Sequence, residues 1–147
     1  MSRVLGVDYG ERRLGFALSD EAQIIALPLG VIVVDHPRQA RLAVERLIRE
    51  KQVGRVVLGM PLNLNGTRGP AAAAVEHFME QLRTTSNVPL ETWDERLSSQ
   101  AAERVLIAAG TRRAKRKTLT NQLAAQIMLQ SYLDARQARG QNQDAWA

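Results

Sequence analysis

The chain has 147 residues and a formal net charge of +5 at pH 7, with 45% hydrophobic and 24% charged residues. Its length favours a single domain over residues 1–147, and the lack of cysteine excludes a disulfide scaffold, a thiolate zinc site and a cysteine nucleophile. Because no long apolar run or early signal segment is present, we expect a cytoplasmic protein without a membrane span, and the positive charge favours a polyanionic partner.

Three strands are expected early in the chain, at residues 4–7, 14–18 and 30–34. The first is apolar on both faces and ends at Asp8, while the third is rich in β-branched side chains. The short links between these strands, one of them a tight turn at Gly10, favour an antiparallel meander.

Helices and strands alternate after the third strand. Apolar side chains recur at helical spacing after Pro37 and again after Pro70, and each proline suits the first turn of a helix. Two short apolar strands are expected at residues 55–59 and 88–94.

Two more helices are expected near the end of the chain. Ser98 can cap the first, and Gly110 ends it. The second carries an apolar stripe over residues 123–132, and the basic segment 112–117 before it is expected to be a linker. From about residue 137 the chain is polar and contains glycine, so we expect a frayed tail.

This order of elements predicts an α/β protein with a five-stranded mixed sheet. Three antiparallel strands are followed by two strands parallel to the first, and helices cover both faces. Functional sites gather at the carboxyl ends of parallel strands. Because Asp8, Gly59 and the pair Asp94 and Glu95 end the three parallel strands, we expect them along one rim.

Three carboxylates on this rim are candidate catalytic residues. An acid at the end of a buried strand loses hydration, and a divalent cation bound through oxygen would compensate for that loss. Adjacent acids on an extended chain point to opposite faces, so only one of Asp94 and Glu95 is expected to be well placed unless the strand has ended. Structural interpretations remain: Asp8 as a turn aspartate, and the acid pair as a helix cap.

Two other segments are candidates for binding phosphate. The glycine-rich loop over residues 59–69 could present backbone amides to a phosphate, or it could be an ordinary surface loop. The segment 112–117 could hold phosphates without reading sequence, or it could be a solvated linker. Its basic side chains are Arg112, Arg113, Lys115, Arg116 and Lys117.

Four segments, taken in order, resemble the YqgF family of RNase H-like nucleases. They are GVDYGERRLGFALSD at 6–20, GMPLN and its loop at 59–66, DERLSS at 94–99, and LAAQIMLQSYL at 123–133. The resemblance covers nearly the whole chain. Members of this family are identified as Holliday-junction resolvases and as nucleases that trim the 5′ end of precursor small-subunit ribosomal RNA.

The resemblance implies an RNase H-like fold and phosphodiester hydrolysis assisted by two Mg²⁺ or Mn²⁺ ions. It implies that Asp8 bridges the two ions, and that Glu95 and Asp94 are the next ligands. Arg13 and Arg96 are then further candidates for binding the substrate, together with the basic segment.

The chain departs from the family at Asn121, where the resemblance leads us to expect an aspartate. Asparagine can bind a metal through its carbonyl oxygen but brings no charge, so the site is expected to bind Mg²⁺ more weakly and to favour Mn²⁺. Asp94 could supply the missing charge. The substitution also leaves open a protein that binds nucleic acid without cleaving it.

We therefore expect a nuclease that processes the 5′ end of pre-16S ribosomal RNA, with structured RNA as its partner. One alternative is a resolvase of branched DNA, which would need a two-fold homodimer for paired cuts. A second is the non-catalytic binder. Half of a sugar-kinase-like or actin-like ATPase is disfavoured, because those enzymes clamp nucleotide between two related domains and only one is expected here.

Overall fold

Five strands form one mixed sheet in the computed structural model, which describes residues 2–61, 63, 65–95 and 98–145. The strand order is β3-β2-β1-β4-β5. β1 pairs antiparallel with β2 and parallel with β4, β2 pairs antiparallel with β3, and β4 pairs parallel with β5. This arrangement confirms the predicted sheet. The strands are β1 (Arg3–Tyr9), β2 (Arg13–Ser19), β3 (Ala26–Val33), β4 (Val53–Met60) and β5 (Leu90–Asp94).

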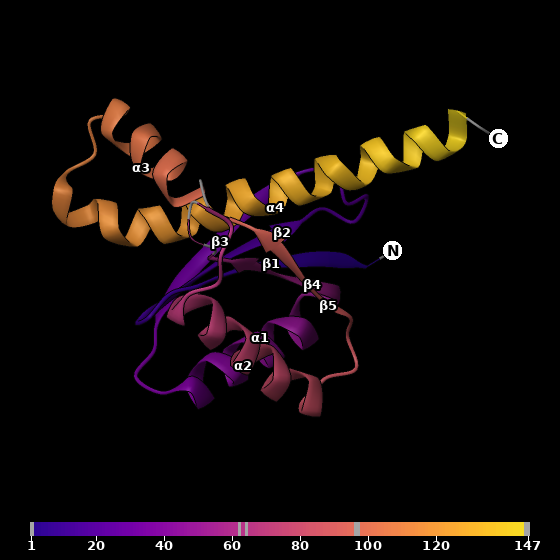
Figure 1. Ribbon diagram of the computed structural model, residues 1–147, viewed down its shortest axis with the longest axis horizontal. Helices are drawn as coiled ribbons and strands as arrows, with labels where there is room; N and C mark the ends of the chain where they lie inside the picture. Colours follow the sequence, from indigo (N-terminus) through magenta and orange to yellow (C-terminus); the bar gives the residue numbers. More distant parts are fainter. Residues whose placement is uncertain (1, 62, 64, 96–97, 146–147) are drawn as a thin grey trace.

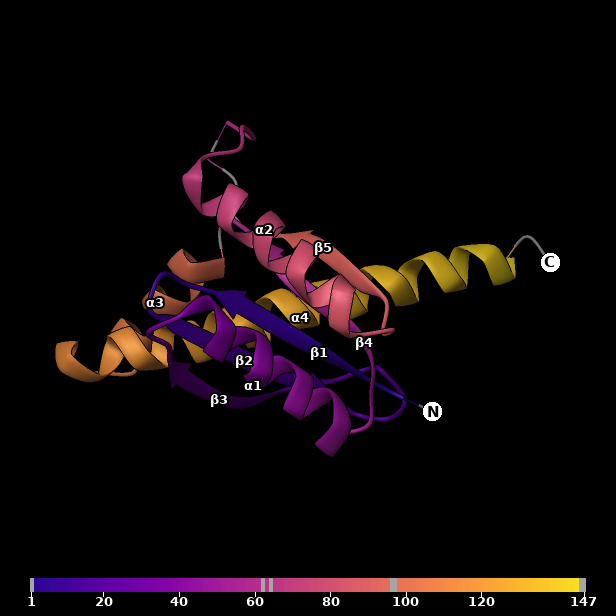
Figure 2. The ribbon, with the colours of Figure 1, turned by 90° about the horizontal axis from the view of Figure 1, so that it is seen from below.

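Helices cover both faces of this sheet, also as predicted. α1 and α2 lie on one face, and α4 crosses the other (Figures 1 and 2). α3 packs against the first turns of α4, and the two project from one end of the sheet as a helical hairpin. The helices are α1 (Pro37–Glu50), α2 (Pro70–Thr85), α3 (Ser98–Ala108) and α4 (Arg113–Ala145). Among the described residues, no helix is both long and apolar enough to cross a membrane.

Alternation along the strands divides the core into two layers. In β1, Leu5 and Val7 are fully buried in the layer of α1 and α2, whereas Val4 belongs to the layer beneath α4. In β4, Leu58 belongs to the layer of α1 and α2, and Val57 belongs to the layer beneath α4. Successive side chains of a strand point to opposite faces. Asp8, which follows Val7, is therefore directed towards the α4 side of the sheet.

Glycines on the α4 side let that helix lie directly on β1 and β2. A Cβ atom on Gly6 would lie 2.9 Å from the Cβ of Leu129, and one on Gly15 would overlap the backbone carbonyl of Asn121. Real Cβ atoms do not come so close to other heavy atoms. The absence of side chains at these two positions therefore sets the distance between α4 and the sheet.

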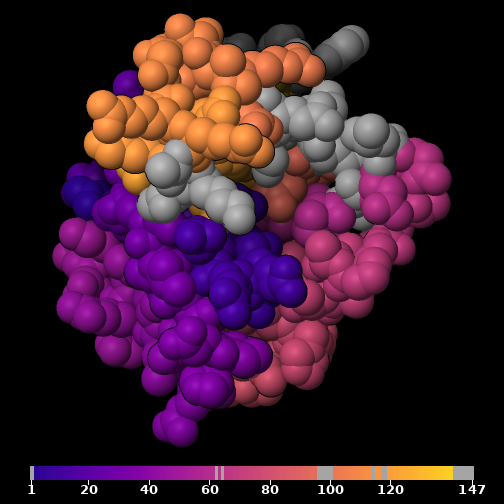
Figure 3. Space-filling view, turned by 90° about the vertical axis from the view of Figure 1, so that its left-hand side faces the viewer, coloured from indigo at the N-terminus to yellow at the C-terminus, as the bar shows by residue number. Residues whose placement is uncertain are grey.

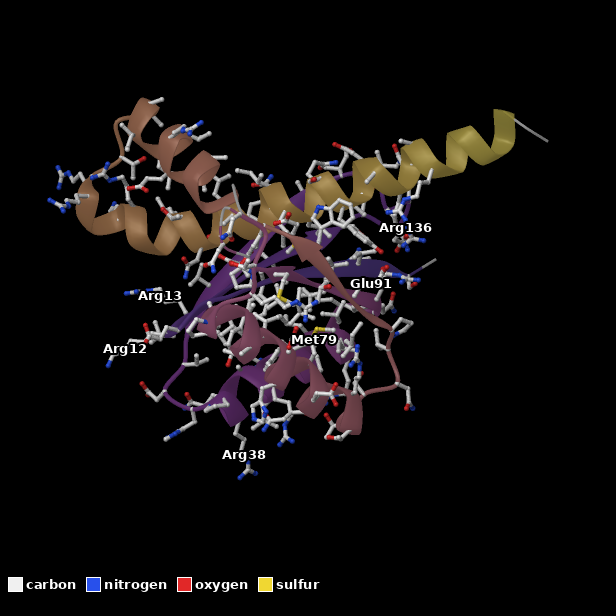
Figure 4. All side chains as sticks on the ribbon, viewed as in Figure 1. Arg12, Arg13, Arg38, Met79, Glu91 and Arg136 are labelled. Carbon is white, nitrogen blue, oxygen red and sulfur yellow. The ribbon has the colours of Figure 1, made fainter. Side chains whose placement is uncertain are left out.

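A polar network ties the edge strand β5 to α4. The Tyr132 hydroxyl donates a hydrogen bond to the Glu91 carboxylate, which also accepts one from Arg55 Nη1 at 2.7 Å. Burial on its own would raise the pKa of Glu91, but the hydrogen bonds from Tyr132 and Arg55 outweigh it and lower that pKa. Trp93 packs edge-on against Tyr132, with ring centroids 5.5 Å apart. Figure 4 shows Glu91 and Arg136 near each other on the right-hand side of the view.

The last helix is longer at both ends than the sequence predicts. The segment 112–117 is not a linker, because α4 already begins at Arg113. Alanine, lysine and arginine are good helix formers, and α3 supplies a surface against which α4 packs. The predicted frayed tail from residue 137 is helical as far as Ala145. This stretch has no proline, and its single Gly140 costs the helix only about 1 kcal/mol.

The third strand is also longer than predicted, since β3 begins at Ala26 rather than at residue 30. Pro28 and Gly30 argue against a strand when sequence alone is considered. β3 lies at the edge of the sheet, however, where a residue without an N–H is tolerated. The register with β2 shifts between Phe16 and Ala17, opposite these two residues.

Candidate active site

Asp8 and Glu95 meet at the rim of the sheet. Asp8 lies near the end of β1, and Glu95 directly follows β5. The Glu95 N–H donates to the Met60 carbonyl at 3.2 Å, so the pairing between β4 and β5 extends one residue beyond β5. The two carboxyl groups hydrogen-bond to each other, and each residue is only 7% exposed. Two acids far apart in the sequence therefore form one buried pair.

Burial increases the proton affinity of this pair of carboxyl groups. Burial, together with the charge of Asp8, the hydrogen bond to Asp8 and the charge of Asp94, raises the pKa of Glu95 from 4.5 to about 10. Burial also raises the pKa of Asp8, although its hydrogen bond with Glu95 partly opposes that effect. Two like charges in contact with little water cannot both ionise cheaply. At neutral pH and without a cation, the pair accordingly keeps a proton between its two carboxyl groups.

Gly59 of β4 provides the space in which Glu95 lies. A Cβ atom at this position would overlap Oε2 and Cδ of Glu95. Within the described part of the chain, the buried Oε2 has no hydrogen-bond partner. A buried carboxylate oxygen without a partner is costly unless a cation or donor reaches it. The site thus holds a carboxyl oxygen whose hydrogen-bonding capacity the described residues leave unused.

Asn121 of α4 lies at the same rim. Asp8 is the cross-strand partner of Gly15, and the Asn121 backbone carbonyl packs directly over Gly15. A Cβ atom on Gly10 would lie 3.7 Å from Asn121 Nδ2. The structure therefore brings the first half of α4 to the end of β1, where Asp8 meets Glu95.

Asp94 occupies a different position from Glu95. It pairs in register with Met60, whose side chain belongs to the layer of α1 and α2, and it is exposed. Its charge still acts on Glu95, whose pKa it raises. Among the described residues, no three His, Cys, Asp or Glu side chains form a group that could hold a metal ion. The site therefore offers a pair of acids together with Asn121, and a ligand role for Asp94 stays a prediction.

The candidate substrate-binding residues that the structure describes fall at the same end of the molecule. Arg13 begins β2, and Figure 4 shows it reaching outward below the first turns of α4. Arg112 and Lys115 are exposed. Arg96 and the side chain of Lys117 lie outside the described residues, so their predicted roles stay predictions.

Arg113 and Arg116 line a groove that the sequence analysis missed. The groove lies between α3 and α4, has a volume of about 470 Å³, and is also lined by Glu103, Thr120 and Asn121. The arginines repeat at helical spacing, which would have indicated a common face had the segment been treated as helix. Instead, its high charge favoured a linker, and a linker has no defined face.

A known protein family matches almost the whole chain. The model of a family described as "RuvX: Holliday junction resolvase" matches residues 2–135. The chain belongs to the RuvX family. RuvX and YqgF are two names for one family, so the predicted membership is confirmed.

Curated RuvX-family relatives match almost end to end. The chain is 47% identical over 133 residues to the "Putative pre-16S rRNA nuclease" of Chloroflexus aggregans, covering 90% of this chain and 94% of that protein. It is also 47% identical over 137 residues to the protein of the same name from Symbiobacterium thermophilum, covering 93% of this chain and 95% of that one.

Solved structures similar to this RuvX-family chain include junction-resolving enzymes. RuvC of T. thermophilus in complex with a Holliday junction substrate matches with a TM-score of 0.58 at 17% identity, covering 93% of this chain and 96% of that one. The fowlpox virus resolvase in complex with Holliday junction DNA matches with a TM-score of 0.57 at 14% identity, covering 90% and 97%. These matches confirm the predicted RNase H-like fold.

Proposed function

We propose that the chain is a nuclease that hydrolyses phosphodiester bonds and trims the 5′ end of pre-16S ribosomal RNA. The observation that carries the proposal is the buried pair of Asp8 and Glu95, with an oxygen of Glu95 to which none of the described residues donates a hydrogen bond. Close relatives named as pre-16S rRNA nucleases support the choice of substrate. A precursor ribosomal RNA as substrate is consistent with a cytoplasmic location.

The residues of the site fit a divalent cation, Mg²⁺ or Mn²⁺. When bound, such ions supply an activated water and neutralise charge on the leaving oxygen. Asp8 and Glu95 would hold them through carboxylate oxygens, and Asn121 lies where its side chain could add a neutral oxygen. The pair must release its shared proton before both acids can bind a cation. Cation binding is therefore expected to strengthen as the pH rises.

Other residues of the chain would act on the substrate itself. Arg13 stands at the same rim and can form charge-assisted hydrogen bonds with a phosphate. Gly59 keeps Glu95 in contact with Asp8, because any side chain at that position would displace it. The apolar layer beneath α4 excludes water from one side of the acid pair, which strengthens its interactions with charge.

Branched DNA is the second candidate substrate. The family description and the similarity to RuvC favour it, and paired cuts across a junction would require a homodimer. Binding without cleavage is the third candidate, and it is favoured by the neutral Asn121 at the site.

A cleavage assay with matched substrates separates these functions. We would compare a pre-16S 5′ leader RNA with a four-way DNA junction, under Mg²⁺ and under Mn²⁺, using the wild-type chain and Asp8→Ala. Preferential trimming of the RNA that is lost in folded Asp8→Ala supports the proposal. If only the junction is cleaved, the substrate is branched DNA, and the protein should then sediment as a dimer. Equal cleavage by folded Asp8→Ala, or none by wild type, would overturn the assignment.

A further inference from the structure

The groove between α3 and α4 opens beside the acid pair. Asn121 belongs both to the wall of this groove and to the rim that carries Asp8. Figure 3 shows this end of the molecule, with the α3–α4 hairpin above the turn between β1 and β2. A ligand in the groove would therefore continue directly into the site where the bond is cut.

Helix geometry aligns the arginines of α4 along this groove. Arg113, Arg116 and Thr120 are spaced i, i+3 and i+7 and share one side of the helix, whereas Lys115 falls on the other side. At a rise of about 1.5 Å per residue, Arg116 lies about 7.5 Å and Arg113 about 12 Å from Asn121 along the axis. Two cationic groups thus extend in a line away from the acid pair.

These two arginines have no carboxylate partner among the described residues. Within the described parts of the chain no ion pair involves Arg113 or Arg116, although Glu103 lines the same groove. Other arginines are paired: Arg55 contacts Glu91 at 2.7 Å, for example. A guanidinium group presents donors in a planar fork that matches the oxygens of a phosphate. The groove therefore has the chemistry of a phosphate-binding track.

We infer that this groove holds a single strand of the nucleic acid next to the bond being cut, with successive phosphates on Arg113 and Arg116. The groove has a volume of about 470 Å³, which is small for a double helix, whose major groove alone is about 12 Å wide and 8.5 Å deep. A duplex could therefore rest on the exposed Arg112 and Lys115, but only one strand can enter. Glu103 repels phosphate from the α3 wall and directs the strand towards α4. This inference rests on the proposed function.

Binding assays on the full chain in EDTA test the groove without requiring cleavage. The probes are a blunt fluorescent RNA duplex and the same duplex with a single-stranded 5′ extension. The wild type is expected to bind the extended probe about tenfold more tightly, since two charge-assisted phosphate contacts are added. Arg113→Gln/Arg116→Gln should lose that preference. The matched control Arg112→Gln/Lys115→Gln should weaken both probes alike and keep the preference.

Glu103→Gln provides an independent test, in which binding is expected to become stronger rather than weaker. Removing its charge should strengthen binding of the extended probe by about threefold and leave the blunt probe unchanged. The inference is overturned if the wild type shows no preference, if both double variants lose affinity equally, or if Glu103→Gln has no effect, provided that melting temperatures are unchanged. If the preference holds but no metal supports cleavage, the nuclease function fails while the groove assignment stands.

Discussion

The carboxyl groups of Asp8 and Glu95 hydrogen-bond to each other across β4, the strand that separates β1 from β5. The contact is possible because β4 carries Gly59 at the crossing point. Two acids on non-adjacent strands are thereby forced together in a setting with little water. This contact destabilises the metal-free protein at high pH, and it prepares the same two side chains to receive a cation.

Glu95→Gln should separate these two effects. In the wild type without metal, the raised pKa of Glu95 contributes stability that is present below about pH 4.5 and is lost as the pH rises towards 10. The neutral amide has no carboxyl proton to lose, so unfolding in EDTA should become less pH-dependent. At pH 8 the melting temperature should rise by roughly 2–4 °C for each kcal/mol regained.

Mn²⁺ provides the complementary measurement on these two proteins. It should raise the melting temperature of the wild type at pH 8 and have little effect on Glu95→Gln, because binding to the folded state alone stabilises it. Equal stabilisation of both proteins by Mn²⁺ would place the cation elsewhere.

Gly59→Ala should displace Glu95 while leaving the fold intact. The new methyl group would overlap the Glu95 carboxyl, which must then move away from Asp8. A shift of about 1 Å in a catalytic group can reduce the rate about a hundredfold, and this is the loss expected in metal-supported cleavage. Gly140→Ala is the matched control, since nothing lies within 4 Å of a Cβ atom there. An active Gly59→Ala enzyme would show that Glu95 need not contact Asp8.

Asn121→Asp should change the choice of metal. A third carboxylate at this rim adds the charge that a hard cation such as Mg²⁺ prefers, so the Mg²⁺ concentration for half-maximal cleavage should fall about tenfold. Gln122→Glu adds the same charge one residue away and should not reproduce the effect. Measuring cleavage by each variant over a range of Mg²⁺ and of Mn²⁺ concentrations tests both expectations. An unchanged Mg²⁺ requirement would exclude Asn121 from the ligand set.

Tyr132→Phe should affect stability without affecting cleavage. It removes the hydroxyl that donates to the Glu91 carboxylate in the network between β5 and α4. Hydrogen bonds to charged groups contribute about 1.5–3 kcal/mol, so urea denaturation should show a loss in that range. A large loss of cleavage at temperatures where the variant is folded would mean that this network also positions the site.

The acid pair could be predicted from sequence because strand geometry determines it. Asp8 ends an apolar strand, and alternation allowed only one of Asp94 and Glu95 to face the same way. The structure places Glu95 in contact with Asp8 and leaves Asp94 exposed on the other side. The resemblance to a nuclease family supplied the order of the motifs, which no single motif could have established.

The groove and the space at Gly59 could not be predicted in the same way. A charged run gives no sign that it is helical until a neighbour such as α3 packs against it, because helices gain most of their stability from packing. Gly59 ends a predicted strand and begins a glycine-rich segment, and its role depends on the side chain of Glu95, which reaches it from just beyond β5. Both features arise from contacts between distant segments.

The contact between Asp8 and Glu95 across β4 also determines when the site can form during synthesis of the chain. A nascent chain that ends before Glu95 lacks one acid, and a chain that ends before Asn121 also lacks the helix that covers the pair. The acid pair therefore cannot form until most of the polypeptide has left the ribosome and β1, β4 and β5 have aligned. Incomplete chains released by failed translation would lack the assembled pair.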